Sequence, residues 1–137
     1  MADYHKYVFR DGKLIAEFEE MYQRSRDIPW HQDEQDNWVD VRLTVEFLKD
    51  IGPFDEIHDF GCGLGYYLEI LKNRIGSVGC RTYGYDVSDT ACIKAVSLFP
   101  DAEFAVFDLM ANPLPASQPA SQPAIIRNSW NAMVCLS

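Results

Sequence analysis

Three alternate glycines in the middle of the chain have the spacing of a ligand cradle. They lie in Gly61-Cys62-Gly63-Leu64-Gly65, directly after the short apolar segment Ile57-His58-Asp59-Phe60. Glycine permits positive φ and lets a ligand approach backbone where a side chain would collide. A helix that follows such a turn presents unpaired amide hydrogens to an anionic group, whereas the carboxylate of Asp59 suits a cationic one. We therefore interpret the turn as a ligand cradle rather than a plain strand-to-helix connection.

Two further aspartates follow later apolar segments. Asp86 comes after Cys80–Tyr85, and Asp108 comes after Glu103–Phe107. A carboxylate at position 86 can accept both hydroxyls of a ribose, and one at position 108 can accept a hydrogen bond from the exocyclic amine of a base. Each has an alternative interpretation: Asp86 as a helix N-cap, a role for which Ser88 or Asp89 competes, and Asp108 as a turn residue.

The elements that must position these residues alternate between strand and helix. Strands are predicted over 57–60, 80–85 and 103–107, and amphipathic helices over 67–75 and 89–99. This alternation predicts a parallel sheet with right-handed crossovers. Ligands of open α/β sheets bind at the carboxyl ends of the strands. The glycine turn and both aspartates therefore converge at one edge of the sheet.

The residues before Gly52 have a different pattern and predict an N-terminal helical cap. We expect an extended start over 7–9, a first helix over 14–22, a polar loop over 24–37 and a second helix over 38–48. Tyr22, Trp30 and Trp38 are expected to pack the core or the cap. The predicted organisation is a cap over residues 1–52 and an α/β domain over 53–137.

Composition limits the function classes. The chain has 137 residues, of which 47% are hydrophobic and 24% charged, as in a soluble globular domain. A net charge of -9 and a pI of 4.6 disfavour a nucleic-acid partner. No apolar run approaches a membrane span and the N-terminus has no secretory signal. The cysteines and histidines lack metal-ligand spacing, so we expect no metal site and reduced thiols in the cytoplasm.

The cradle does not follow the dinucleotide fingerprint G-x-G-x-x-G. Counted from Gly61, the third glycine of that pattern would stand at position 66, where the chain has Tyr66. A tyrosine there would obstruct close packing of the helix on the sheet. The acid at position 59 also disfavours a pyrophosphate. A domain that binds nicotinamide dinucleotide is therefore the third hypothesis.

Three motifs together resemble class I S-adenosylmethionine-dependent methyltransferases. Residues 57–71 resemble the first motif of that family, Tyr83-Gly84-Tyr85-Asp86-Val87-Ser88 its second-strand motif, and Phe104–Leu109 its third-strand motif. Residues 131–135 are weakly similar to its fourth strand, with Asn131 where an aspartate is usual. The segment before residue 52 is more loosely similar to the cap of small-molecule members. The resemblance is strongest over residues 54–110.

The resemblance implies a Rossmann-like fold, S-adenosyl-L-methionine as cofactor and a role for each matched residue. The first motif would hold the methionyl part, Asp86 the ribose, and the third motif the adenine, with Val87 against its face. The cofactor-binding residues implied in this way are Asp59, Gly61, Cys62, Gly63, Asp86, Val87, Asp108 and Leu109. The chain shows no identifiable catalytic base; His31 and His58 are candidates by residue type only.

Methyl transfer to a small molecule is the leading hypothesis, and a module that binds cofactor without turnover is the second. The family sheet has seven strands, as the resemblance implies, and this sequence predicts at most four, the last within Trp130–Leu136. We therefore expect the C-terminal strands to be missing. The Pro-rich segment 113–124, with Pro-Ala-Ser-Gln twice in tandem, is predicted to be a loop. Strand four would then be an exposed edge through which copies of the chain could associate.

Overall fold

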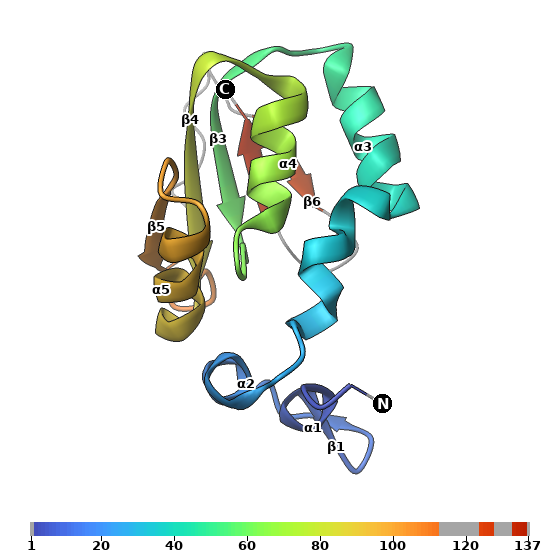
Figure 1. Ribbon diagram of the computed structural model, residues 1–137, viewed down its shortest axis with the longest axis vertical. Coiled ribbons are helices and arrows are strands. Elements are labelled where there is room, and N and C mark those ends of the chain that lie inside the picture. The colour runs from blue at the N-terminus through green and yellow to red at the C-terminus, as the bar shows by residue number, and fades with distance from the viewer. Residues whose placement is uncertain (1, 113–123, 128–132, 137) are drawn as a thin grey trace.

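The sheet of this protein combines three parallel strands with two antiparallel ones. The computed structural model describes residues 2–112, 124–127 and 133–136. The strands are β3 (Phe54–Phe60), β4 (Gly76–Asp86), β5 (Glu103–Val106), β6 (Ala124–Arg127) and β7 (Met133–Leu136). Their order across the sheet is β5-β4-β3-β7-β6 (Figure 1). β5, β4 and β3 are parallel, β7 runs antiparallel to β3, and β6 runs antiparallel to β7.

Three helices complete the α/β unit and confirm the predicted fold class. They are α3 (Val39–Lys49), α4 (Tyr66–Ile75) and α5 (Asp89–Leu98). α4 contacts β3 and β4, α5 contacts β4 and β5, and α3 contacts α4. In Figure 1, α4 and α5 lie in front of the strands. The order strand, helix, strand, helix, strand with parallel pairing is that of a Rossmann-like half.

The core lies between this helical layer and the sheet. Along β3 the side chains alternate, so that Ile57 and Asp59 are buried while Glu56 and His58 are only partly buried. Ile57 belongs to a cluster of buried residues to which α3 and α4 contribute Val41, Val45, Leu48, Tyr67, Leu68, Leu71 and Ile75. Helical spacing of these residues places them on one face of each helix. The alternation therefore places a carboxylate, Asp59, on the buried side of the sheet.

The N-terminal residues form a cap of short elements. These are α1 (His5–Val8), β1 (Phe9–Arg10), β2 (Lys13–Leu14), α2 (Phe18–Arg24) and the 3-10 helix η1 (Pro29–Asn37). The predicted extended start over 7–9 is wrong at Tyr7 and Val8, which are helical. The first long helix begins at Phe18 rather than Leu14, because Leu14 pairs with Phe9 in a hairpin whose turn uses positive φ at Asp11 and Gly12. The predicted polar loop over 24–37 is largely the helix η1.

The cap is tied to the α/β unit by apolar and polar contacts. Met21 of α2 is fully buried in a cluster that includes Leu64 and Ala91 of the α/β unit. The carboxylate of Glu19 accepts hydrogen bonds from the Ser88 hydroxyl at 2.5 Å and from the Thr90 amide at 3.2 Å. It also accepts one from the Thr90 hydroxyl. These bonds lower the pKa of Glu19 to about 2, so the carboxylate remains an ionised acceptor at neutral pH.

The C-terminal part of the sheet corrects two expectations. A strand lies within Trp130–Leu136 as predicted, but β7 is antiparallel to β3 instead of continuing the parallel series. β6 was not predicted, because Ala124 was assigned to the Pro-rich loop. Since β6 pairs along the outer side of β7, β7 is not an edge strand. The edge strand on this side of the sheet is β6 instead, and association of copies through a sheet edge stays a prediction. The predictions for 113–123 and for 130–132 lie outside the described residues.

Two further observations concern what the described residues lack. Among the described residues, 2–112, 124–127 and 133–136, no helix is long and apolar enough to span a bilayer. The same residues contain no group of three or more histidine, cysteine or acidic side chains arranged to hold a metal ion.

Candidate ligand-binding site

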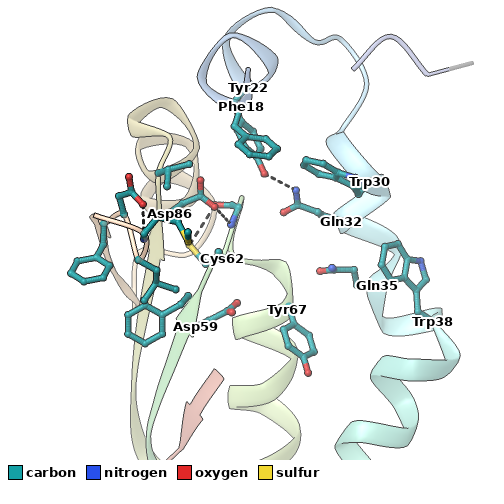
Figure 2. A pocket seen from close by; sticks show the side chains of 18 residues that line it. Phe18, Tyr22, Trp30, Gln32, Gln35, Trp38, Asp59, Cys62, Tyr67 and Asp86 are labelled. Atoms are coloured by element: carbon teal, nitrogen blue, oxygen red, sulfur yellow. Dashed lines mark hydrogen bonds between the residues drawn. The ribbon is translucent and has the colours of Figure 1, made fainter. Parts of the chain in front are cut away.

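A cavity of about 350 Å³ lies where the strand tips meet the cap. This is a usual size for a small-molecule site. Figure 2 shows the side chains of the strand tips on one side of it and those of α2, η1 and the start of α3 on the other. Every residue that the sequence analysis assigned to cofactor binding lines this one cavity: Asp59, Gly61, Cys62, Gly63, Asp86, Val87, Asp108 and Leu109.

The glycine turn is folded by backbone conformations that only glycine adopts readily. Gly61, Gly63 and Gly65 have φ of 84°, 53° and 87°. The amides of Gly61 and Cys62 both donate to the carbonyl of Tyr85, at 2.7 and 2.9 Å, which ties the turn to β4. A Cβ atom at Gly63 would lie 2.7 Å from the Tyr22 hydroxyl. A side chain at Gly63 therefore has no room, because Gln32 and Tyr22 of the cap lie against this glycine where the sequence had predicted the approach of a ligand.

Asp86 is buried at the tip of β4 and anchors the turn. One of its carboxylate oxygens accepts from the Gly63 amide at 2.8 Å, and the other accepts from the Ser88 amide at 3.0 Å. Burial raises the pKa of Asp86, and these two amide bonds oppose the rise. The N-cap of α5 is Ser88, whose hydroxyl accepts from the Ala91 amide. Because each carboxylate oxygen can accept a second bond, Asp86 keeps the capacity to bind hydroxyls in the cavity.

Asp59 is the most unusual group of the cavity. Its side chain is 1% exposed, and among the described residues neither carboxylate oxygen has a hydrogen-bond partner. Burial, and secondarily the charge of Asp86, raise the pKa of Asp59 to about 7. Figure 2 shows the carboxylate pointing toward the space between α4 and the cap. A buried carboxylate without donors is costly, so this arrangement favours a ligand that brings a cation or N–H donors to Asp59.

The segment after β5 completes the strand-tip side of the cavity. Asp108 is exposed, and its carboxylate accepts from the Met110 amide at 2.8 Å, as in an aspartate turn. Asp108 is therefore a turn residue and a residue of the cavity lining at the same time. Val87 is 49% exposed and lines the cavity with Leu109. Partly exposed apolar side chains at a cavity wall can pack on the face of a planar ring.

The cap contributes residues that the sequence analysis did not assign to the site. Its lining residues are Phe18, Tyr22, Trp30, Gln32, Gln35 and Trp38. Tyr22, Trp30 and Trp38 were expected to pack the core or the cap, and they also line the cavity. Gln32 is buried, accepts from the Leu64 amide at 2.9 Å and donates to the Tyr22 hydroxyl at 3.0 Å. No local signal marks these residues, since their role depends on how the cap docks.

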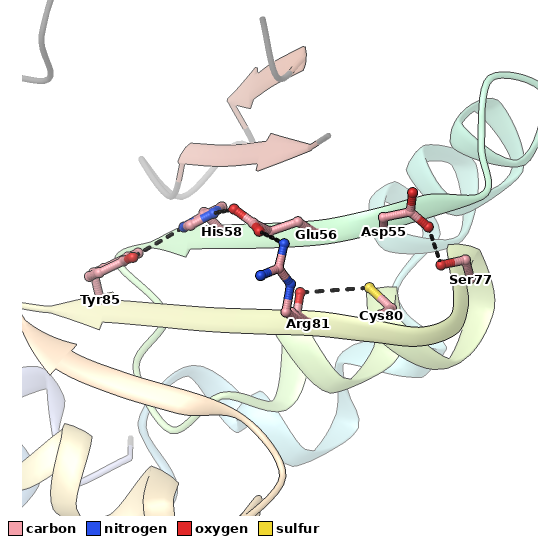
Figure 3. A network of polar contacts seen from close by, with 7 residues as sticks. All are labelled: Asp55, Glu56, His58, Ser77, Cys80, Arg81 and Tyr85. Carbon is pink, nitrogen blue, oxygen red and sulfur yellow. Dashed lines mark hydrogen bonds and ion pairs between the residues drawn. The ribbon is translucent and has the colours of Figure 1, made fainter. Parts of the chain in front are cut away.

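His31 and His58, the two histidines considered as candidate bases, do not line the cavity. His58 lies between Glu56, whose carboxylate is 2.5 Å from its Nε2, and Tyr85, whose hydroxyl is 3.1 Å from its Nδ1. Figure 3 shows this network, which also includes the ion pair of Arg81 with Glu56. Because neighbouring side chains of a strand point to opposite faces, His58 faces away from Asp59. The ring of His31 packs near Tyr4 instead.

Comparisons with known proteins find similar solved structures only. No family model matches the chain, and no curated protein matches it. A TehB-like SAM-dependent methyltransferase from Corynebacterium glutamicum is 21% identical over 65% of this chain and 51% of its own, with a TM-score of 0.42. A geranyl diphosphate methyltransferase in complex with SAM is 19% identical over 82% of this chain and 42% of its own, with a TM-score of 0.46.

A third solved structure is geranyl diphosphate C-methyltransferase from Streptomyces coelicolor, in complex with Mg²⁺, geranyl diphosphate and S-adenosyl-L-homocysteine. It is 20% identical over 82% of this chain and 39% of its own, with a TM-score of 0.40. This chain therefore spans about half, or less, of the length of these three structures. At such identities the acceptors of those proteins do not carry over to this chain.

Proposed function

We propose that this chain binds S-adenosylmethionine in the cavity between the strand tips and the cap, and that it transfers the methyl group to a small-molecule acceptor. The observation that carries the proposal is Asp59, a fully buried carboxylate with no partner among the described residues, set beside a glycine turn in a cavity of about 350 Å³. A sulfonium cofactor with an ammonium group supplies the donors and the positive charge that such a carboxylate favours.

The residues of the cavity fit the parts of this cofactor. The turn at Gly61 and Gly63, with Asp59 beneath it, would hold the methionyl part. Asp86 would accept the ribose hydroxyls with its remaining lone pairs, and Asp108 would accept from the adenine amine while Val87 and Leu109 pack on the ring. When bound, the cofactor supplies a methyl group already activated by its sulfonium. The chain's own work is to align the acceptor with this methyl group and to exclude water.

A nicotinamide dinucleotide fits the same cavity less well. The third glycine of its fingerprint is replaced by Tyr66, which begins α4. The acids Asp59 and Asp86 both lie at the turn where a pyrophosphate would bind, and no described lysine, arginine or histidine lines the cavity to offset them. Negative charges beside the turn oppose the binding of a pyrophosphate.

A module that binds cofactor without turnover is the second candidate. The observation that favours it is that neither described histidine candidate, His31 or His58, lines the cavity. A methyl acceptor whose nucleophile carries no proton would need no base. The missing base therefore does not decide between the enzyme and the binding module, and an experiment must separate them.

The three described free cysteines, Cys62, Cys80 and Cys92, support a reducing location such as the cytoplasm.

Calorimetric titration with S-adenosylhomocysteine and with NAD tests the proposal. We expect S-adenosylhomocysteine to bind with one-to-one stoichiometry and NAD to give no heat at the same concentration. Failure to bind S-adenosylhomocysteine at millimolar concentration would reject both methyl transfer and the cofactor-binding module. A screen of acceptors with a methyl-labelled donor then separates the two, since only the enzyme yields labelled product.

A further inference from the structure

The cap side of the cavity has its own chemistry, distinct from that of the strand tips. Four of its residues are apolar or amphipathic rings, Phe18, Tyr22, Trp30 and Trp38, and two are carboxamides, Gln32 and Gln35. In Figure 2 these side chains lie opposite Asp59 and Asp86 across the open space. If the strand tips hold the cofactor, as proposed above, the cap side is the wall left for the acceptor.

The charges around the cavity all have one sign. Its acidic lining residues are Asp59, Asp86 and Asp108, and no lysine, arginine or histidine of the described residues lines it. The cofactor brings one net positive charge with its ammonium, carboxylate and sulfonium groups. The occupied site would therefore keep an excess of negative charge, and an anionic acceptor would enter without a compensating cation.

The aromatic wall matches a cation rather than an anion. The face of an aromatic ring carries negative electrostatic potential and attracts ammonium groups, tryptophan most strongly. Trp30 is held against neighbouring rings, with its centroid 5.7 Å from that of Tyr4 and 6.2 Å from that of Phe18. Its backbone is in the left-handed region, with φ of 54°. The chain thus maintains an uncommon backbone conformation at a ring that lines the cavity.

We propose that the acceptor is a small amine with an apolar or aromatic body, bound as its ammonium form between the cap rings and the carboxylates of the strand tips. The inference rests on the proposed function, because it takes the strand tips as the cofactor side. The same charges disfavour carboxylates, phosphates and diphosphates as acceptors.

The chemistry of the transfer balances without a further reagent. The bound ammonium first loses one proton to solvent and regains its lone pair. The lone pair then forms the new N–C bond while the S–C bond of the donor breaks, and the electron pair of that bond stays on sulfur. A neutral amine and a sulfonium thus become a methylated ammonium and a neutral thioether.

Three probes of similar size and different charge test the acceptor class: phenethylamine, 2-phenylethanol and 3-phenylpropanoate. Each is titrated by calorimetry into the chain saturated with S-adenosylhomocysteine. We expect the affinity for the amine to be at least about ten-fold higher than that for either other probe. This difference in affinity should decline with added salt. Equal affinity of the alcohol, or tighter binding of the carboxylate, overturns the amine assignment.

Variants at the wall localise the effect. Trp30→Leu is expected to reduce the affinity ratio of amine to alcohol by about five-fold, the scale of one lost cation–π contact, while S-adenosylhomocysteine affinity stays within about two-fold. Trp38→Leu serves as a second variant if Trp30→Leu unfolds. Phe47→Leu is the matched control, because Phe47 lies on α3 and is 65% exposed, and this variant should change neither affinity. An unchanged ratio in both folded tryptophan variants overturns the assignment of the cap wall.

Failure of this inference is distinguishable from failure of the proposed function. The titration with S-adenosylhomocysteine alone comes first. Loss of that binding overturns both proposals, because the second depends on the first. Binding of S-adenosylhomocysteine without a preference for the amine overturns the acceptor class alone and leaves cofactor binding in place.

Discussion

Replacement of Asp59 by asparagine is expected to make the free protein more stable and the cofactor complex weaker. The pKa of this buried carboxyl is about 7 in the folded chain, against a reference value of 3.8. One pKa unit corresponds to about 1.4 kcal/mol, so the ionised carboxylate costs the fold on the order of 4 kcal/mol above pH 7. An asparagine amide without partners at the same place costs about 1–3 kcal/mol. Asp59→Asn should therefore gain roughly 1–3 kcal/mol at pH 8.

The sign of the pH dependence follows from the raised pKa. Between pH 4 and pH 7 the folded chain binds more protons than the unfolded chain at this site, so wild-type stability falls as the pH rises through this window. The asparagine variant lacks this term. Its advantage over the wild type should therefore be largest at pH 8 and should shrink toward pH 5.

Urea unfolding followed by tryptophan fluorescence at pH 5 and pH 8 measures both effects. Asp101→Asn is the matched control, since Asp101 is exposed and its removal should change stability by less than about 0.5 kcal/mol. The same variants are titrated with S-adenosylhomocysteine, where Asp59→Asn should weaken binding by about ten-fold, the scale of a lost hydrogen bond to a charged group. A variant less stable than wild type at pH 8, or a gain equal at both pH values, would refute the reasoning.

Three further predictions concern the turn, the strand tip and the cap. Gly63→Ala should lower the free energy of unfolding by about 1–3 kcal/mol more than Gly79→Ala, because both have positive φ but only Gly63 is crowded; thermal or urea unfolding of the pair measures this, and equal losses would contradict it. Asp86→Ala should weaken cofactor binding by about 1.5–3 kcal/mol, measured by calorimetry; an unchanged affinity would reject the ribose assignment. Glu19→Gln should make limited proteolysis of the cap faster, whereas Glu20→Gln, on the exposed side of α2, should not. Since the pKa of Glu19 is lowered to about 2, the stability it contributes is present above pH 4.5 and is lost as the pH falls toward 2; a cap equally protected in both variants would exclude this role.

The strand-tip half of the site could be predicted because its signals are local. Glycines at alternate positions, and aspartates directly after apolar segments, mark strand ends regardless of what packs on them. The eight residues assigned from these signals and from the resemblance to methyltransferase motifs all line one cavity. The boundaries of β4 were less well predicted: it begins at Gly76, because Phe54 pairs with Gly76 across an irregular register.

The cap half could not be predicted in the same way. Gln32 reaches the cavity because η1 docks beside the glycine turn, and nothing in the polar sequence around it specifies that docking. The apolar spacing from Leu14 predicted a helix, yet Leu14 lies in a hairpin, because the turn at Asp11 and Gly12 dominates the local structure. The short strand β6 was hidden in a Pro-rich context. It pairs with its neighbour in sequence, β7, and β7 joins the sheet through its long-range pairing with β3.

A crystal structure of the chain with S-adenosylhomocysteine tests the central claim most directly. We predict electron density for the ligand in the cavity, with the ribose hydroxyls on Asp86, the amino group at Asp59 and the adenine beside Leu109. Density for the ligand elsewhere on the molecule, or an empty cavity at saturating ligand concentration, would contradict the account.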